Sequence, residues 1–362
     1  MNQLDVRASL LNACDELQAY LQSEAPDPND LETKTTTLRA ALRALGGRSL
    51  LGLKIPLRWG GSQISDLDYF VYQEALARYS GTLAFIQTQH QTAAALIARG
   101  SSEFLKQKYL PYLSQGQILA GVSFSHLRRA GPPSLRAVPD ESDYRLSGSV
   151  PWLSGYGLFQ RAITAATLPN GQILLALLPF GETSQSWGGR LTFSQPMQLA
   201  AMDATNTVSA ELHDWLLTAE NVVDIRPAGW LAIRDQQNSL NPTPLILGSA
   251  RAGLDVVQGI AQAGADAAVA ESWTSLDREL GNCRAAILAA KAQPTPAEEQ
   301  LHLRAWSLDV AQRCTYAAVI VSRGAANQRQ NAAQRIYREV VVFSVSGQTT
   351  AVMAATLARL VR

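Results

Sequence analysis

The amino-acid sequence predicts an α+β protein of several domains, because its hydrophobic periodicity changes twice along the chain. Residues 1–116 follow helical spacing, residues 117–228 form short extended runs between turns, and residues 229–362 return to helical spacing. We therefore expect an N-terminal helical domain, a middle β domain and a C-terminal helical bundle. A chain of 362 residues is long enough to hold three such domains.

Two helices are expected in the second half of the first region. Ser65 with Asp68 fits an N-cap, since a serine hydroxyl can accept a hydrogen bond from the amide three residues on, and the helix that it starts runs through Ala77. Gly81 is expected to interrupt the chain before a second helix over residues 82–98.

The middle region is read as β structure because its apolar runs are short and bounded by turn residues. Asn170-Gly171 lies between two of these runs and is a typical two-residue hairpin turn. The expected strands are residues 118–124, 144–147, 162–168, 172–178 and 209–215.

The C-terminal region predicts packed helices with more apolar surface than one bundle needs. Apolar stripes run over residues 247–261 and 303–321, and a linker at residues 293–296 separates the helices. The run 340–343 and the alanines between 263 and 270 add further apolar faces. This surplus predicts a symmetric homo-oligomer whose interface lies mainly after Pro244, or else close packing between helices of one chain.

Composition excludes several classes of function. The net charge is +1, so a nucleic-acid or anionic-membrane footprint is not expected, and no run of 18 uncharged apolar residues predicts a membrane span. Three cysteines without paired spacing indicate reduced thiols, and no basic-then-apolar leader is visible at the start of the sequence, so a cytoplasmic protein without a metal site is expected. Charged residues make up 17% of the chain, which favours extensive buried surface.

The segment with the clearest chemical meaning follows the second expected strand. Trp152 and Ser154 are two residues apart on an extended segment, so their side chains project to the same side. A flat indole beside a hydroxyl suits a planar heteroaromatic ring such as a flavin. The alternative is a buried structural tryptophan beside a turn serine.

Around this segment the chain resembles the acyl-CoA dehydrogenase superfamily, and the order of the matching motifs over roughly 170 residues carries the resemblance. The matching segments are Gly52-Leu53-Lys54-Ile55-Pro56 with Gly60-Gly61, Lys108-Tyr109-Leu110-Pro111 through Gly116, Tyr144-Arg145-Leu146-Ser147-Gly148 ahead of Trp152, and Met202-Asp203-Ala204-Thr205-Asn206-Thr207. The resemblance implies a helical domain, a β-barrel or sandwich and a four-helix bundle, assembled as a homodimer or homotetramer.

The resemblance also implies FAD, or FMN in its place, between the β domain and the bundle. Trp152 would stack on the isoalloxazine ring, Ser154 would bond near its N5 atom, and Gly155 would let the backbone approach closely. Ser123 and Ser125 are candidates for the hydroxyl at the ring edge, with Ser125 preferred. The alternative for both serines is to satisfy backbone groups at the end of a strand.

The loop that holds the flavin phosphates and substrate in the family departs from the family pattern. Here it carries His126, Arg128 and Arg129 and keeps Ser134. These residues are candidates for contacts with a phosphate or with the substrate, because charged donors bind phosphate strongly. A solvated basic loop is the alternative.

The catalytic glutamate of the family has no counterpart. In the family it lies in a Tyr-Glu-Gly-Thr turn, where this chain has Ser346 and Gly347, and neither can accept a proton at neutral pH. Some branches place the base on the preceding helix, where Asp255 is the one carboxylate of the segment 248–255. Asp255 is thus either a relocated base or part of a polar helix face.

Three functions follow from the resemblance. The first is a flavin-dependent oxidoreductase acting on an acyl thioester, such as a CoA thioester, or a similar apolar substrate. The second is a two-component reduced-flavin monooxygenase, a branch of the same superfamily whose sequence pattern the segment 247–255 resembles. The third is a non-catalytic relative that keeps the fold for binding. The electron acceptor or flavin reductase is not identified by the sequence.

Overall fold

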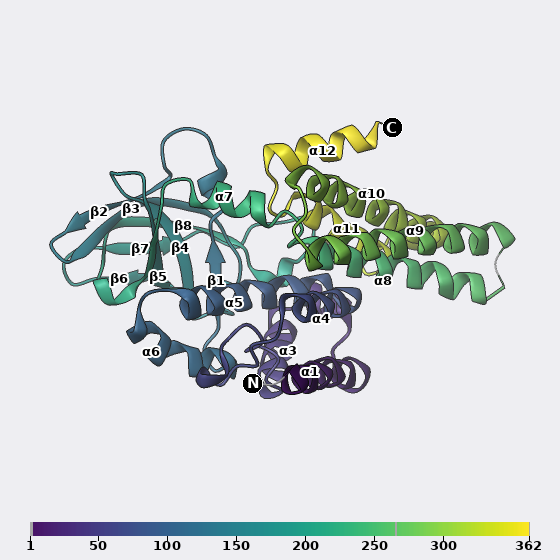
Figure 1. The fold of residues 1–362 in the computed structure, drawn as a ribbon, viewed down its shortest axis with the longest axis horizontal. Coiled ribbons are helices and arrows are strands. Elements are labelled where there is room, and N and C mark those ends of the chain that lie inside the picture. Colours follow the sequence, from purple (N-terminus) through teal and green to yellow (C-terminus); the bar gives the residue numbers. More distant parts are fainter. Residues whose placement is uncertain (1–2, 265, 362) are drawn as a thin grey trace.

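The computed structural model describes residues 3–264 and 266–361 and confirms the predicted fold class. Figure 1 shows helices in purple and blue, a β region in teal and a bundle of helices in green and yellow. Short connections at residues 115–119 and 227–229 separate these parts, and the predicted domain boundaries at 116/117 and 228/229 stay predictions.

The N-terminal region contains α1 (Gln3–Ser23), α2 (Pro28–Thr33), α3 (Thr35–Gly47), α4 (Asp66–Tyr79), α5 (Gly81–Arg99) and α6 (Glu103–Ser114). The predicted N-cap is confirmed, since the Ser65 hydroxyl accepts the amide of Asp68 at 3.1 Å. The prediction for Gly81 is wrong. The interruption lies one residue earlier, at Ser80, which caps α5, and Gly81 is the first residue of that helix. A Cβ at Gly81 would lie 2.8 Å from the carboxyl carbon of Glu339, so packing requires the glycine.

The β region is one mixed sheet with strand order β6-β7-β8-β3-β2-β4-β5-β9, with β1 pairing in parallel to β4. The hairpin at Asn170-Gly171 is confirmed, since β4 and β5 pair antiparallel across it. The strands are β1 (Ala120–Ser123), β2 (Leu135–Asp140), β3 (Asp143–Leu153), β4 (Arg161–Thr167), β5 (Ile173–Pro179), β6 (Thr183–Ser184), β7 (Arg190–Phe193), β8 (Val208–Leu217) and β9 (Val222–Arg226).

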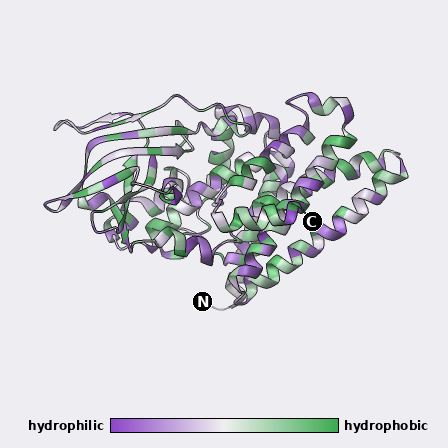
Figure 2. Ribbon diagram, turned by 90° about the horizontal axis from the view of Figure 1, so that it is seen from above, coloured by the Kyte–Doolittle hydropathy of each residue, from purple (hydrophilic) through white to green (hydrophobic). Residues whose placement is uncertain are grey.

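The C-terminal region begins with the short helix α7 (Trp230–Gln237) and continues with α8 (Thr243–Gln262), α9 (Ala267–Ala292), α10 (Ala297–Val321), α11 (Ala332–Val345) and α12 (Thr350–Leu360). The helices α8 to α11 form the expected bundle, and the predicted linker falls between α9 and α10. Green and purple segments alternate along the bundle helices in Figure 2, as expected for helices with one buried face. In the part of the chain that the structure describes, every helix is too short or too polar to cross a membrane.

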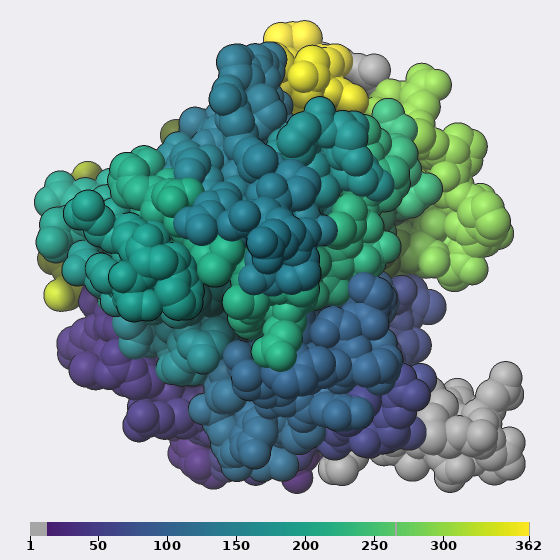
Figure 3. All heavy atoms as spheres, turned by 90° about the vertical axis from the view of Figure 1, so that its left-hand side faces the viewer, coloured from purple at the N-terminus to yellow at the C-terminus, as the bar shows by residue number. Residues whose placement is uncertain are grey.

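Helix α5 joins the helical and β regions through a buried histidine. The His90 Nδ1 atom accepts the amide of Ala120 at 3.2 Å, so Nε2 carries the proton and donates to the carbonyl of Leu113 at 3.0 Å. Burial lowers the pKa of His90 to about 4, which keeps the ring neutral. One side chain thus fixes α5 against the end of α6 and the start of β1. Figure 3 views the molecule from the β region, with the N-terminal helices beneath it.

Candidate functional site

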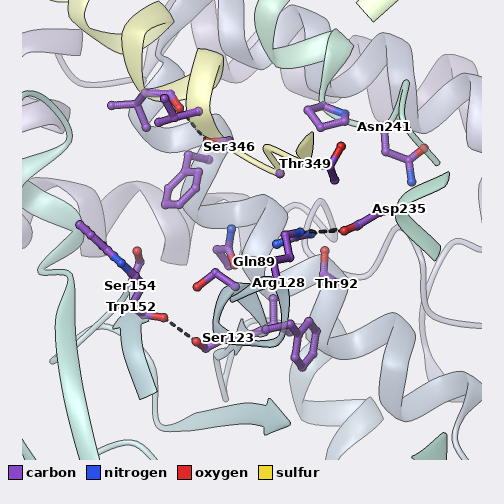
Figure 4. Close-up of a pocket in the computed structure, with 18 of the residues that line it drawn as sticks. Gln89, Thr92, Ser123, Arg128, Trp152, Ser154, Asp235, Asn241, Ser346 and Thr349 are labelled. Atoms are coloured by element: carbon purple, nitrogen blue, oxygen red, sulfur yellow. Dashed lines mark hydrogen bonds and ion pairs between the residues drawn. The ribbon is translucent and has the colours of Figure 1, made fainter. Parts of the chain in front are cut away.

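A cleft of about 540 Å³ lies where the three regions meet. Helix α5 supplies Gln89 and Thr92, the ends of β1 and β3 supply serines and a tryptophan, and the bundle supplies the segment after α11. Figure 4 shows these side chains around the hollow, with Ser346 and Thr349 on the side opposite Ser123. The cleft is open rather than filled by side chains, so a ligand can enter it.

Trp152 and Ser154 both line this cleft, as their alternation predicted. Trp152 is 45% exposed, so the alternative of a buried structural tryptophan is wrong. Ser154 follows the end of β3, and its hydroxyl lies 2.8 Å from the Thr207 hydroxyl. A large apolar face left open beside a pair of hydroxyls is a ready surface for a planar ring.

The two candidate serines have different surroundings. Strand β1 ends at Ser123, whose hydroxyl donates to the carbonyl of Trp152 at 2.5 Å and so satisfies a backbone group. Ser125 lies past the strand, at the start of a short 3₁₀ turn (Ser125–Arg128). Its hydroxyl oxygen is buried, lines the cleft and has no hydrogen-bond partner among the described residues. Ser125 therefore retains its capacity for a ligand, whereas Ser123 orients Trp152.

Gly155 has a different role from the one expected. Its φ is +103°, and a Cβ there would lie 2.4 Å from the ring of Phe159. Its amide donates to the carbonyl of Thr205 at 2.6 Å, and it is not among the described residues that line the cleft. The glycine is thus required by a tight turn against Phe159, not by the approach of a ligand.

The basic loop brings only one of its candidate residues to the cleft. His126 is buried, and its Nε2 atom lies 2.7 Å from the carbonyl of Ala165, while burial lowers its pKa. Arg129 is exposed, and the Ser134 hydroxyl is buried without a partner among the described residues. The structure places Arg128 at the cleft, but its guanidinium donates twice to the carboxylate of Asp235, at 2.7 and 2.8 Å.

Asp235 is a cleft residue that the sequence did not reveal. It lies on α7, and it is the only acidic side chain that lines the cleft among the described residues. Its partner Arg128 is 107 positions away in the sequence. Neither residue has a neighbouring pattern that indicates the pair, because α7 is short and carries mixed polar and apolar residues.

Arg304 on α10 is the second residue that the sequence did not reveal. It is 1% exposed, and its guanidinium donates to the carbonyls of Ser239 and Ser346, at 3.3 and 2.9 Å. Both carbonyls lie just beyond the C-terminal ends of helices, α7 and α11, where the helix dipole is negative. Burial lowers the pKa of Arg304 to about 10, which still leaves it charged.

Comparison with known proteins finds partial matches to acyl-CoA dehydrogenases. The model of the acyl-CoA dehydrogenase N-terminal domain matches residues 11–117. The chain is 26% identical over 142 residues to the mitochondrial isovaleryl-CoA dehydrogenase of Pongo abelii, covering 38% of this chain and 33% of that protein. It is 29% identical over 116 residues to the (2S)-methylsuccinyl-CoA dehydrogenase of Cereibacter sphaeroides, covering 31% and 21%. By sequence, this chain is therefore similar to acyl-CoA dehydrogenases over part of its length.

Solved structures show a likeness in fold over the whole of this chain. Butyryl-CoA dehydrogenase of Megasphaera elsdenii matches with a TM-score of 0.78 and 18% identity, covering 100% of this chain and 99% of that one. Glutaryl-CoA dehydrogenase of Mycobacterium smegmatis, in complex with FADH2, matches with a TM-score of 0.81 and 15% identity, covering 99% and 95%. The prolyl acyl carrier protein oxidase AnaB matches with a TM-score of 0.78 and 16% identity, covering 100% and 99%.

The curated relatives match this chain over only about a third of their own length or less. These alignments cover too little of the relatives to carry their substrates or their catalytic residues to this chain. What the cleft does must therefore be argued from its own side chains.

The resemblance predicts that the family's catalytic glutamate is replaced by Ser346 or Gly347. Ser346 and Gly347 both line the cleft. The Ser346 hydroxyl donates to the carbonyl of Val342 at 2.8 Å, within its own helix end. Asp255, the other candidate, lies on α8 and accepts two hydrogen bonds from Arg78, at 2.7 and 2.9 Å. The structure does not bring Asp255 to the cleft.

Proposed function

We propose that this protein is a flavin-dependent oxidoreductase that binds FAD in the cleft and acts on an acyl thioester or a similar apolar substrate. The observation that carries the proposal is the exposed indole of Trp152 facing an open cleft. The glutaryl-CoA dehydrogenase structure with FADH2 supports the choice of flavin.

The residues at the cleft fit a flavin. Trp152 offers the stacking surface, the Ser154 and Thr207 hydroxyls lie beside it, and the buried Ser125 hydroxyl lacks a partner among the described residues. When bound, FAD would supply the acceptor for a hydride or for electrons from the substrate. The protein's own part is to orient the ring, to exclude water behind it and to hold the substrate between the ring and Ser346.

The lack of an unpaired carboxylate favours a second candidate, a reduced-flavin monooxygenase. Among the described residues of the cleft, the one acidic group is Asp235, which Arg128 already neutralises. A reaction that begins with removal of an α-proton needs a free base opposite the ring, whereas oxygen insertion does not. The purely non-catalytic alternative is less favoured, because a cleft of about 540 Å³ remains open.

Replacing Trp152 by alanine is expected to weaken FAD binding by about 5- to 150-fold, which corresponds to about 1–3 kcal/mol of lost stacking and burial. Titration of the purified protein with FAD, followed by flavin fluorescence, measures the change. Trp187→Ala is the matched control, because Trp187 is 55% exposed in the β6–β7 turn and does not appear among the cleft residues. Absence of any flavin binding by the unmodified protein, in either redox state, would rule out the proposal.

We further propose a homo-oligomer that forms through the C-terminal helices. Large apolar side chains are exposed along α10, α11 and α12, namely Tyr316, Ile320, Val345, Met353, Leu357 and Leu360. Apolar surface of this extent is usually covered by a partner. Sedimentation at micromolar concentration is expected to show a dimer or tetramer, and Ile320→Glu with Leu357→Glu is expected to dissociate it. A monomeric unmodified protein would contradict the proposal.

A further inference from the structure

A second hollow of about 520 Å³ lies beside the cleft. The residues that line both hollows include Leu231, Ser239 and Thr349 together with the ion pair Arg128–Asp235. The second hollow is bounded mainly by aliphatic groups, from Leu127, Leu301 and Val352 among others. Two spaces with so many shared walls are neighbouring chambers, and the ion pair lies on the boundary between them.

Helix α7 is the partition between the two chambers. Arg234 and Asn238 face the cleft, Ala232 and Gln236 face the second hollow, and Asp235 contributes to both. These pairs are four residues apart, as expected for separate faces of one helix. This short helix therefore forms part of the wall between the chambers, together with Arg128, Thr349 and Val352.

The packing of α7 is weak along most of its length. Of its eight residues only Leu231 is buried, and Ile233 is 50% exposed. The N-terminal end has no side-chain cap in the described structure, whereas at the C-terminal end the Asn238 side-chain amide donates to the carbonyl of Arg234 at 2.8 Å. The residue before the helix, Gly229, has a φ of +73° that permits a sharp bend. A helix this short is not stable without tertiary contacts.

Contacts at the two ends and one ion pair hold α7 in place. The ring of Trp230 meets Phe124 edge-on, with centroids 5.7 Å apart, and past the helix Ser239 is fixed by Arg304. Between these anchors, the bidentate bond from Arg128 to Asp235 is the salt bridge that joins α7 to the β region among the described residues. The side chains of Arg128 and Asp235 are 28% and 17% exposed, so water can reach the pair and take the place of either partner.

We propose that α7 is a strap latched by Arg128–Asp235, and that its release joins the two hollows into one channel. Opening moves residues 232–238 away from the β region while the anchors at Trp230 and Ser239 stay in place. The joined channel would admit an elongated, largely apolar substrate to the cleft. This last part rests on the proposed function, whereas the motion of the strap does not.

Hydrogen exchange of the α7 amides tests the latch directly. In Asp235→Asn the carboxylate is replaced by an isosteric amide, and the peptide covering α7 is expected to exchange about fivefold faster, as expected for loss of a partly exposed ion pair. Asp140→Asn is the matched control, because it breaks the ion pair with Arg145 on the sheet and leaves α7 unchanged. The charge-reversed double variant Arg128→Glu with Asp235→Arg is expected to restore slow exchange.

Two results would overturn the strap. Unchanged exchange of α7 in Asp235→Asn would show that the pair is not a latch, and equally faster exchange throughout α8 would show a general loss of stability. A second measurement addresses the channel, using the rate at which FAD associates with the cofactor-free protein. Faster association in Asp235→Asn supports the channel, and an unchanged rate contradicts it. If no variant binds FAD, the proposed function fails, while hydrogen exchange still decides the strap.

Discussion

Replacing Ser346 by glutamate is expected to raise the rate at which octanoyl-CoA reduces the bound flavin by about 100-fold or more, the usual contribution of a positioned general base. Ser346 lines the cleft, and the resemblance predicts the family's base at this position, where the unmodified chain has a hydroxyl. The Arg304 guanidinium beside this position would keep the new carboxylate ionised and ready to accept a proton. Stopped-flow absorbance of the flavin band measures the rate.

A matched control keeps the charge but changes its place. Ser344→Glu introduces a carboxylate two residues earlier on α11, where the Ser344 hydroxyl donates to Val340 and the residue is absent from the described cleft lining. No gain in the rate of flavin reduction is expected from this variant. Asp255→Asn is expected to leave the rate unchanged, because Asp255 is engaged with Arg78. Fast turnover by the unmodified chain, unaffected by Asp255→Asn, would show that the base has another location.

Replacing Glu339 by alanine is expected to lower the free energy of unfolding by about 3–5 kcal/mol, since it leaves a buried charge without its partner. Glu339 is 1% exposed and accepts hydrogen bonds from the Arg335 guanidinium at 2.9 Å and from the amide and hydroxyl of Thr82, each at 3.1 Å. The substitution also removes the atoms that pack on Gly81. Urea denaturation followed by tryptophan fluorescence measures the change.

Two further variants distinguish the buried network from ordinary loss of a charge. Glu339→Gln keeps an acceptor for Thr82 and is expected to lose less stability than the alanine variant. Glu298→Ala removes an exposed glutamate near the start of α10, and the expected change is within about 0.5 kcal/mol. Equal effects of Glu339→Ala and Glu298→Ala would contradict the role assigned to the buried pair.

Local patterns in the sequence predicted the local parts of the site. The two-residue spacing of Trp152 and Ser154 predicted that both lie on one side of the chain, and both line the cleft. The replacement of the family's glutamate by Ser346 stays a prediction from the resemblance. The Ser65 cap and the Asn170-Gly171 hairpin were equally readable, because each depends on bonds between residues close in the chain.

Features that depend on distant partners were not predictable. Nothing near Arg128 indicates that its partner is Asp235, and nothing near Gly155 shows that Phe159 will pack where a Cβ would be. Several strands were also missed, among them β2, β7 and β9. They are short and flanked by polar residues, so pairing with neighbours rather than their own pattern makes them strands.

The double attachment of Arg304 has a consequence for how this protein can change over evolution. One guanidinium holds the backbone on both flanks of the cleft, at Ser239 and at Ser346. A substitution that shifts the backbone on one flank therefore moves the Arg304 guanidinium and changes the effect of mutations on the other flank. Epistasis between these two segments is the expected result, and laboratory evolution of a new specificity would progress faster by varying them jointly than by altering one position at a time.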